Sequence, residues 1–292
     1  MHKPDLSQAS TRRTVLAGAV LAAALSVAIY WYYQRGSIST NNAYVGAHIV
    51  QIAAQVSGPV TQVYVSDNQA VTKDAPLFAI DPESFRLAVA RTEAQLQQHR
   101  AELKLAKTNA KRTESLVLKK YLSPQAGDDA ATAVKTAQAA YLGAKASYEQ
   151  AKLDLAHTTV TAPVAGTVAN LSLRPGTIVQ ASAPLFALIG ADQFWIDANF
   201  KETELEQIRH DDIAEIHVDS YPHHVFHGKV ESVSGGSGTA FSLLPAENAT
   251  GNWVKVTQRV PVRIMVTDPD PKYPLRIGTS AEVTVRLTKS AS

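Results

Sequence analysis

An internal repeat constrains the fold of this chain more than any other feature of its sequence. Residues 56–80 align with residues 164–188 without a gap, at a constant offset of 108, and the pentapeptide APLFA occurs at the same place in both copies. A β-segment of about 25 residues cannot bury a core by itself. We therefore expect the two copies to pack against each other as one pseudo-symmetric β-sandwich, split by the segment between them.

Each copy alternates apolar and polar residues in short runs that Gly, Pro, Asn or Asp interrupt. This pattern is typical of strands joined by tight turns. Asn68 and Gly176 occupy the same position of the repeat. Because both residue types tolerate a positive φ, the pattern predicts a turn that passes through the left-handed region in each copy.

The segment between the copies carries apolar or small residues every seven positions, which is typical of helices that pack along a coiled-coil seam. On the first arm, residues 82–120, the two columns are Phe85, Thr92, His99, Ala106 and Thr113, and Val89, Leu96, Leu103, Ala110 and Val117. On the second arm they are Ala130, Ala137, Ala144 and Ala151, and Val134, Tyr141, Tyr148 and Leu155. A break is predicted at Ser123, Pro124 and Gly127. We expect an antiparallel hairpin with arms of roughly 30–38 residues, about 45–57 Å long at 1.5 Å per residue.

The chain beyond the second copy is β-rich, with short strands at a spacing typical of a small β-barrel. The strands are predicted at residues 194–198, 215–218, 228–233, 260–266 and 280–287. The segment 201–209 (KETELEQIR) is predicted to be a short helix. Residues 38–54 could return to complete the barrel.

The N-terminal part of the sequence contains a candidate membrane anchor. Residues 14–33 are uncharged and mostly apolar, and a helix needs roughly 20 such residues to cross a bilayer. Basic residues precede this stretch, so the positive-inside rule places residues 1–13 in the cytoplasm and the following chain outside. A cleaved signal peptide is the alternative, but bulky aromatic residues stand where small residues would precede a cleavage site.

The composition argues against several classes of function. The formal net charge is +2 and 18% of the residues are charged, a balance that does not suggest a nucleic-acid binder. The chain has no cysteine, which excludes disulfides, thiolate metal ligands and cysteine nucleophiles. No Ser-His-Asp or paired-carboxylate pattern has a supporting local context. We therefore expect neither an enzyme nor a bound cofactor.

Two further motifs are interpreted as structural. Five histidines crowd into a short stretch: His210, His217, His223, His224 and His227. A pair of them could meet on a metal ion, but no acidic cluster accompanies them, so we interpret them as surface residues and predict no metal site. Residues 235–238 (GGSG) lack the lysine and the following helix of a phosphate-binding loop and are interpreted as a flexible link.

The order of these parts resembles the HlyD/EmrA-type membrane fusion proteins, over residues 14–288. NNAYV at 41–45, DANFKET at 197–203 and the stretch 237–262 are similar to the EmrA branch. The resemblance implies a periplasmic adaptor of a tripartite efflux pump, anchored once in the bacterial inner membrane with its N-terminus in the cytoplasm. It also implies an inner-membrane transporter of the major facilitator type as partner, and a ring of adaptors such as a hexamer.

The same resemblance implies a docking site at the hairpin tip. Adaptors that engage a TolC-like outer-membrane channel carry Arg, Leu and Ser at a fixed spacing there, and RTESLVLKKYLS supplies Arg112, Leu116 and Ser123 at that spacing. Arg and Leu four residues apart lie on one helix face, where the leucine can fill a groove and the arginine can bond carbonyl or carboxylate groups. Alternatively, Ser123 only caps a helix that begins at Pro124, and Arg112 is an ordinary solvated residue.

The predicted fold is mixed, all-β plus a coiled coil. Its parts are a cytoplasmic tail (1–13), a transmembrane helix (14–33), a periplasmic linker with the barrel-completing strand (34–54), the first half of a lipoyl-like β-sandwich (55–81), the α-helical hairpin (82–158), the second half (159–189), the small β-barrel (190–288) and a tail (289–292).

Two other functions compete with the adaptor. A biotin or lipoate carrier has a similar β-fold, but it presents its modified lysine in a tight hairpin that the helical arms replace here. A structural coiled-coil protein would explain the hairpin and give the duplicated β-segments no role.

Overall fold

The computed structural model describes residues 36–238 and 255–287, and these fall into two compact units. One unit holds the residues up to His48 and from Gln193 onward, and the other holds Ile49–Asp192. The chain passes between the units within β1 (Ser37–Ala53) and within β8 (Pro184–Lys201).

The terminal tails predicted at 1–13 and 289–292 and the anchor predicted at 14–33 lie outside the described residues. None of the helices in the described part of the chain combines the length and the apolar composition that a membrane crossing requires.

The repeat is visible in the strands of the second unit. The first copy supplies β2 (Gly58–Val63), β3 (Ala70–Val71) and β4 (Pro76–Ile80), and the second supplies β6 (Gly166–Ala169), β7 (Ile178–Val179) and the beginning of β8. Each strand of the second copy begins 108 residues after its counterpart, at 166, 178 and 184 against 58, 70 and 76. An edge strand, β5 (Thr159–Thr161), pairs with β4.

The two copies pair with each other reciprocally. Gly58 of β2 lies opposite Val179 of β7, and Gly166 of β6 lies opposite Val71 of β3, which is the same pairing with the copies exchanged. Neither copy therefore closes a sheet alone. The expectation of one pseudo-symmetric β-sandwich is confirmed.

The turns of the two copies are equivalent as well. Asn68 has φ 62° and Gly176 has φ 88°, so both adopt the left-handed conformation that the sequence predicts. The amide of Asn68 donates to the carbonyl of Val168 at 2.9 Å, and the amide of Gly176 donates to the carbonyl of Val60 at 2.8 Å. Each turn thus reaches across to the other copy and ties the halves together.

The core of the sandwich is drawn from both halves. Leu77, Phe78 and Ile80 of β4 are almost completely buried, as are Val168 and Leu188 of the second copy. The rings of Phe78 and Phe186, which are equivalent residues of the repeat, meet edge to face at 6.1 Å between centroids. The repeated APLFA motif therefore places one phenylalanine from each copy at the centre of a shared core.

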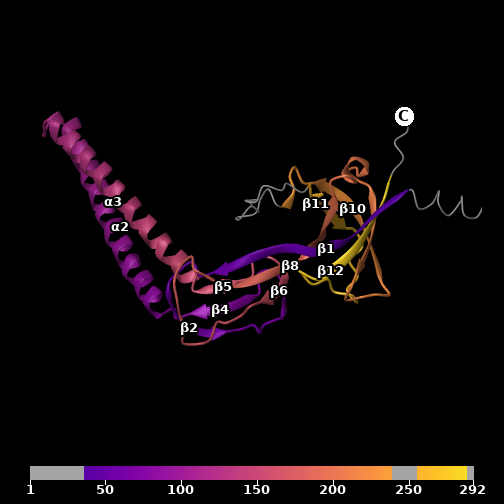
Figure 1. The fold of residues 1–292 in the computed structure, drawn as a ribbon. Coiled ribbons are helices and arrows are strands. Elements are labelled where there is room, and N and C mark those ends of the chain that lie inside the picture. The colour runs from indigo at the N-terminus through magenta and orange to yellow at the C-terminus, as the bar shows by residue number, and fades with distance from the viewer. Residues whose placement is uncertain (1–35, 239–254, 288–292) are drawn as a thin grey trace, which may run out of the picture. The chain divides into compact units, whose positions relative to one another are not determined.

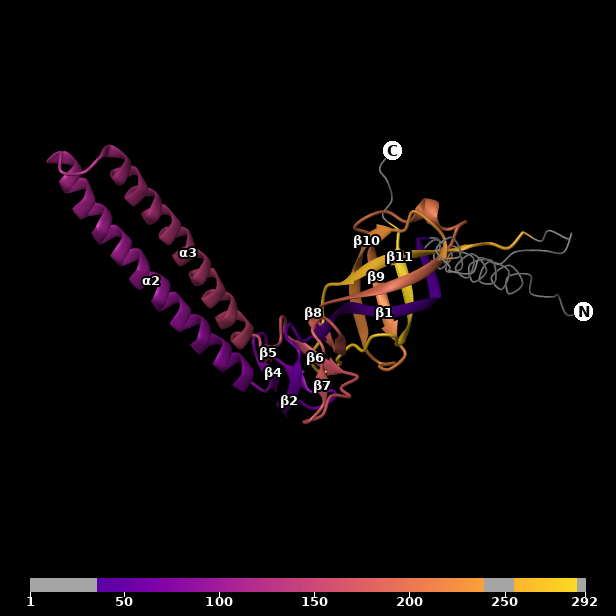
Figure 2. The ribbon, with the colours of Figure 1, turned by 90° about the vertical axis from the view of Figure 1, so that its left-hand side faces the viewer.

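The helical hairpin consists of α2 (Glu83–Leu118) and α3 (Pro124–Ala156), which run antiparallel side by side (Figures 1 and 2). Their 36 and 33 residues correspond to about 54 and 50 Å at 1.5 Å per residue. Every residue of the four predicted columns is buried or half-buried, while most other positions are exposed. The predicted seam is confirmed.

The predicted break at Gly127 is wrong. Gly127 lies inside α3, whose first turn begins at Pro124 with Ser123 as its N-cap. A proline at the first helical position pre-sets φ for the helix, and a glycine in the helix costs only about 1 kcal/mol relative to alanine. The connection between the arms is therefore confined to residues 119–123.

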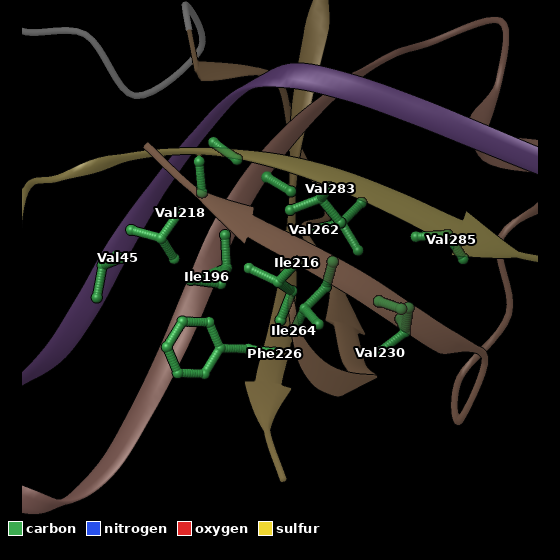
Figure 3. Packing of buried hydrophobic residues seen from close by; sticks show 14 of the residues in the cluster. Val45, Ile196, Ile216, Val218, Phe226, Val230, Val262, Ile264, Val283 and Val285 are labelled. Atoms are coloured by element: carbon green, nitrogen blue, oxygen red, sulfur yellow. The ribbon is translucent and has the colours of Figure 1, made fainter. Parts of the chain in front are cut away.

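The other unit is a closed barrel in which the strands follow the order β1-β12-β9-β10-β11-β8, with β1 paired to β8. The remaining strands are β9 (Ile213–Val218), β10 (Val225–Val233), β11 (Arg259–Val266) and β12 (Ser280–Arg286). Alternate residues of all six strands point inward, among them Val45, Ile196, Phe226, Ile264 and Val283 (Figure 3). The predicted barrel is confirmed, and the predicted segment completes it only up to His48, because Ile49–Ala53 of β1 belong to the sandwich unit.

The helix predicted at 201–209 is wrong. β8 continues to Lys201, and the only helical residues of this segment form the short 3-10 turn Leu205–Gln207. Lys201 pairs with Arg259 of β11 and is extended, the amide of Glu202 donates to the carbonyl of Gln258 at 3.0 Å, and Glu202–Glu204 form a turn. The tertiary partner overrides the helical preference of the charged residues.

Candidate functional site

The hairpin tip begins where α2 ends. Its backbone is fixed by two hydrogen bonds from amides after the helix to carbonyls in the last turn of α2. The amide of Lys120 donates to the carbonyl of Val117, and the amide of Tyr121 donates to the carbonyl of Leu116, each at 2.9 Å. Lys120 has φ 61°. This is the Schellman arrangement, in which glycine usually occupies the left-handed position. The chain turns sharply here and directs the residues after Leu118 away from the seam.

The second arm begins with a well-defined cap. Ser123 is extended (φ −71°, ψ 153°), and its hydroxyl oxygen accepts a hydrogen bond from the amide of Ala126 at 3.4 Å. Pro124 follows as the first helical residue. The structure thus gives Ser123 the capping role that the alternative interpretation predicts, although its exposed hydroxyl still has a proton to donate.

Arg112 and Leu116 lie on α2 close to this turn, and both are exposed. The guanidinium of Arg112 has no carboxylate within ion-pairing distance among the described residues. The Leu116 side chain is 41% exposed although it is apolar. The predicted residues are therefore close together along one arm and available to a partner.

The tip exposes further apolar side chains that the sequence motif does not include. Leu118 is 79% exposed, Tyr121 is 75% exposed and Leu122 is 41% exposed. Together with Leu116 they put four exposed apolar side chains within residues 116–122, which makes this end of the hairpin a candidate interaction site. A signal was present in the sequence, because Leu118 and Leu122 are large apolar residues outside the seven-residue columns.

The hairpin has two different flanks beside its seam. On the first flank, Glu102, Leu105 and Asn109 of α2 line a shallow groove with Ala130 and Ala133 of α3. On the second flank, near the tip, Glu114 and Leu118 line a groove of about 460 Å³ with Pro124, Asp128 and Ala131. Arg112 lies seven residues after Leu105 and is therefore on the first flank. Leu116 lies four residues after Arg112 and is on the same flank.

The chemistry of the tip is suited to binding rather than to catalysis. It combines apolar area with the cations Arg112, Lys119 and Lys120. The pKa of Glu102, farther down the same arm, is lowered by its hydrogen bonds from Gln98 and His99. That carboxylate lies on the exposed helix surface, so it stabilises the arm and does not form a reactive centre.

The histidines of the barrel unit have separate surroundings. His224 stacks on Tyr273 at 4.2 Å between ring centroids, and His227 pairs with Asp268 at 2.8 Å. The described residues contain no group of three His, Asp or Glu side chains that could hold a metal ion.

Known proteins resemble both units. Residues 48–190 match the barrel-sandwich hybrid domain of RND membrane fusion proteins, and residues 193–286 match the AAEA-like β-barrel domain. The fatty acid resistance protein FarA of Neisseria gonorrhoeae is 35% identical, over 87% of this chain and 76% of its own length. The multidrug export protein EmrA of Escherichia coli (strain K12) is 33% identical, over 91% of this chain and 80% of its own.

The fold likeness extends to solved structures. The membrane fusion protein Spr0693 from Streptococcus pneumoniae R6 superposes with a TM-score of 0.63 at 15% identity, over 87% of this chain and 99% of that one. The same combination of strands, hairpin and barrel therefore occurs in proteins whose sequences have diverged widely.

Proposed function

Because the chain belongs to the membrane fusion proteins of the EmrA type, the non-enzymatic periplasmic adaptors of efflux pumps, we propose that it links a transporter of the major facilitator type in the inner membrane to a TolC-like channel in the outer membrane. The hairpin tip docks on the channel. The sandwich and barrel associate with neighbouring copies as a ring, such as a hexamer. Residues 14–33 anchor the chain beside the transporter, with residues 1–13 in the cytoplasm.

The observation that carries this proposal is the exposure at the far end of the hairpin. A helical pair of about 50 Å that buries its seam has no internal need for bare leucines at its end. Leu116 nevertheless remains exposed on the flank of Arg112, which has no ion-pair partner among the described residues, and Leu118 and Tyr121 remain exposed at the same end of the hairpin. Tyrosine and arginine are among the residues that contribute most binding energy at protein interfaces, and this end of the hairpin presents Tyr121 and Arg112.

The transported substrate is proposed by similarity. FarA is named for fatty acid resistance and EmrA for multidrug export. We expect this chain to serve the export of drugs or other small molecules. The transporter selects the compound, whereas the adaptor supplies the closed path.

The docking proposal is tested by the double variant Arg112→Ala/Leu116→Ala in a strain that depends on this adaptor. We expect loss of drug tolerance with unchanged amounts of protein in the membrane fraction. The matched control is Arg91→Ala/Leu105→Ala, which removes one arginine and one leucine side chain from the same flank but farther from the tip. Normal drug tolerance of the tip variant would refute the tip assignment, and equal loss in the control would show that the effect is not local.

A further inference from the structure

The second flank of the hairpin carries a row of cations on α2. Arg100, Lys104, Lys107 and Lys111 line one groove of about 460 Å³, together with Leu103 and Thr108. Spacings of four, three and four residues keep all four side chains on one face of the helix. Two further cations from α3 at the same height would bring the number of positive charges on this flank to six.

α3 does contribute two lysines to this flank. The groove near the tip places Asp128 and Ala131 of α3 on it. Seven residues after Asp128 is Lys135, and fourteen after Ala131 is Lys145. Because the seam repeats every seven residues, both lysines lie on the same flank as the α2 row. We call Arg100, Lys104, Lys107, Lys111, Lys135 and Lys145 together the basic stretch.

On this flank, between its outermost cations on each helix, the basic stretch contains no acid, and its nearest acids are Glu114, three residues after Lys111, and Glu149, four residues after Lys145. By the same seven-residue count, the acids of this flank are Glu93 and Glu149 toward the base, and Glu114 and Asp128 toward the tip. Among the described residues, none of the six cations forms an ion pair. Like charges held this close repel one another, so a bound polyanion would stabilise them.

The position of the stretch argues against a lipid surface as the partner. Counted from Glu83, Arg100 stands about 26 Å along α2 and Lys111 about 42 Å, on an arm of about 54 Å, at 1.5 Å per residue. A membrane would be met at an end of such an arm. The cations lie along its side.

A second copy of the hairpin is also a poor match. The other flank carries one acid of α2 at this height, Glu102, and that carboxylate is already hydrogen-bonded to Gln98 and His99. Its α3 residues at this height include Ala133 and Ala140, which have no charge. The second copy therefore offers little charge complementarity to six cations.

We propose that the basic stretch binds a carboxylate-rich polymer that the hairpin passes on its way across the periplasm, namely the peptide stems of the cell-wall peptidoglycan. The inference rests on the proposed function for its compartment. Five of the six cations are lysines, which act as mobile point charges, whereas bidentate recognition of a single carboxylate or phosphate favours arginine. A flexible row of this kind suits carboxylates spaced irregularly along a polymer.

The test is co-sedimentation of the purified full-length protein in detergent with purified peptidoglycan sacculi. We expect salt-sensitive binding, weakened roughly tenfold or more in Lys104→Gln/Lys107→Gln/Lys111→Gln, since a field of like charges changes association by at least that factor. The control Arg86→Gln/Arg91→Gln/Lys119→Gln removes as much charge from α2 and its C-cap outside the basic stretch, and should change binding less than about twofold. Circular dichroism should show both variants to be equally helical.

Two parallel arms distinguish the source of the negative charge. Lipopolysaccharide micelles and vesicles of anionic phospholipid should bind more weakly than sacculi. Failure of the wild-type protein to sediment, equal losses in both variants, or stronger binding to either phosphate-bearing surface would each overturn the inference. None of these outcomes touches the docking proposal, which is decided separately by drug tolerance of the Arg112→Ala/Leu116→Ala variant.

Discussion

The sandwich and the hairpin belong to one unit of the chain but are stabilised in different ways. In the sandwich, Phe78, Leu77 and Val168 are completely buried in a core built from both repeat copies. In the hairpin, the buried helix residues are Thr92 and Leu103 of α2 and Ala151 of α3. The sandwich holds its shape by enclosed apolar area, whereas the hairpin has a single seam and leaves both flanks exposed for partners.

The largest effect of this difference should follow from the core variant Phe78→Ala. Removing a buried phenylalanine costs about 3–5 kcal/mol of unfolding free energy, through lost burial and the cavity left behind. Hydrogen exchange of the β2 and β4 amides should report that loss. Leu105→Ala, at a position 61% exposed on α2, is the control. It should change the unfolding free energy that hydrogen exchange reports by less than about 0.5 kcal/mol. Equal effects of the two substitutions would remove the distinction between core and hairpin.

A smaller effect is expected from the seam variant Leu103→Ala. The side chain is 7% exposed but is packed by only two helices, so we expect a loss near the lower end of the range for such substitutions, about 2 kcal/mol. The loss should appear in the amides of α2 and α3 and leave β2 and β4 protected. Faster exchange in the strands would mean that the hairpin and the sandwich unfold as one cooperative element.

At the tip, Lys120→Gly should stabilise the hairpin. Lys120 holds the left-handed conformation at φ 61°, which costs a residue with a side chain about 1 kcal/mol that glycine avoids. The neighbouring Lys119 has φ −82°, so Lys119→Gly is the matched control and should destabilise the hairpin by roughly 0.5–1 kcal/mol. Thermal unfolding followed by helical circular dichroism measures both, and the same sign for the two variants would contradict the assigned turn.

The smallest expected effect is a pH dependence at Glu102. The hydrogen bonds from Gln98 and His99 lower the pKa of this carboxyl below its ordinary value of 4.5. The contribution of the Glu102 carboxylate to the stability of the helix is therefore present above pH 4.5. It is lost as the pH falls through the lowered pKa. Helicity of the wild-type protein and of Glu102→Gln should converge on acidification. A difference that is constant across this range would contradict the assigned interaction.

Much of the fold could be predicted because the repeat and the seam are periodic. The offset of 108 predicts the turns at Asn68 and Gly176, and every position of the seven-residue columns is buried or half-buried. The exchange of strand partners between the copies could not be predicted. A duplicated sequence is equally compatible with pairing inside each copy, and only the packed core distinguishes the two arrangements.

The errors and omissions occur where local patterns compete with tertiary contacts. Residues 201–209 have a helical composition, but Lys201 is held extended by pairing with Arg259 of β11, and a turn follows it. Gly127 predicts a break because glycine usually interrupts helices, but the residue lies within α3. The motif of Arg112, Leu116 and Ser123 does not include Leu118 and Tyr121; the place of Leu118 outside the seven-residue columns is a signal of its exposure, whereas Tyr121 lies in the connection, where the columns give no indication.

The most direct measurement is site-specific photo-crosslinking in living cells, with a photoreactive residue at Leu118, at Tyr121 or at Leu87. Leu87 is 70% exposed near the base of α2, so it matches the tip positions in exposure while differing in location. If the tip docks on the outer-membrane channel, probes at Leu118 and Tyr121 should crosslink to the channel protein and the probe at Leu87 should not. Channel adducts from Leu87 alone, or equally from all three positions, would contradict docking through the tip.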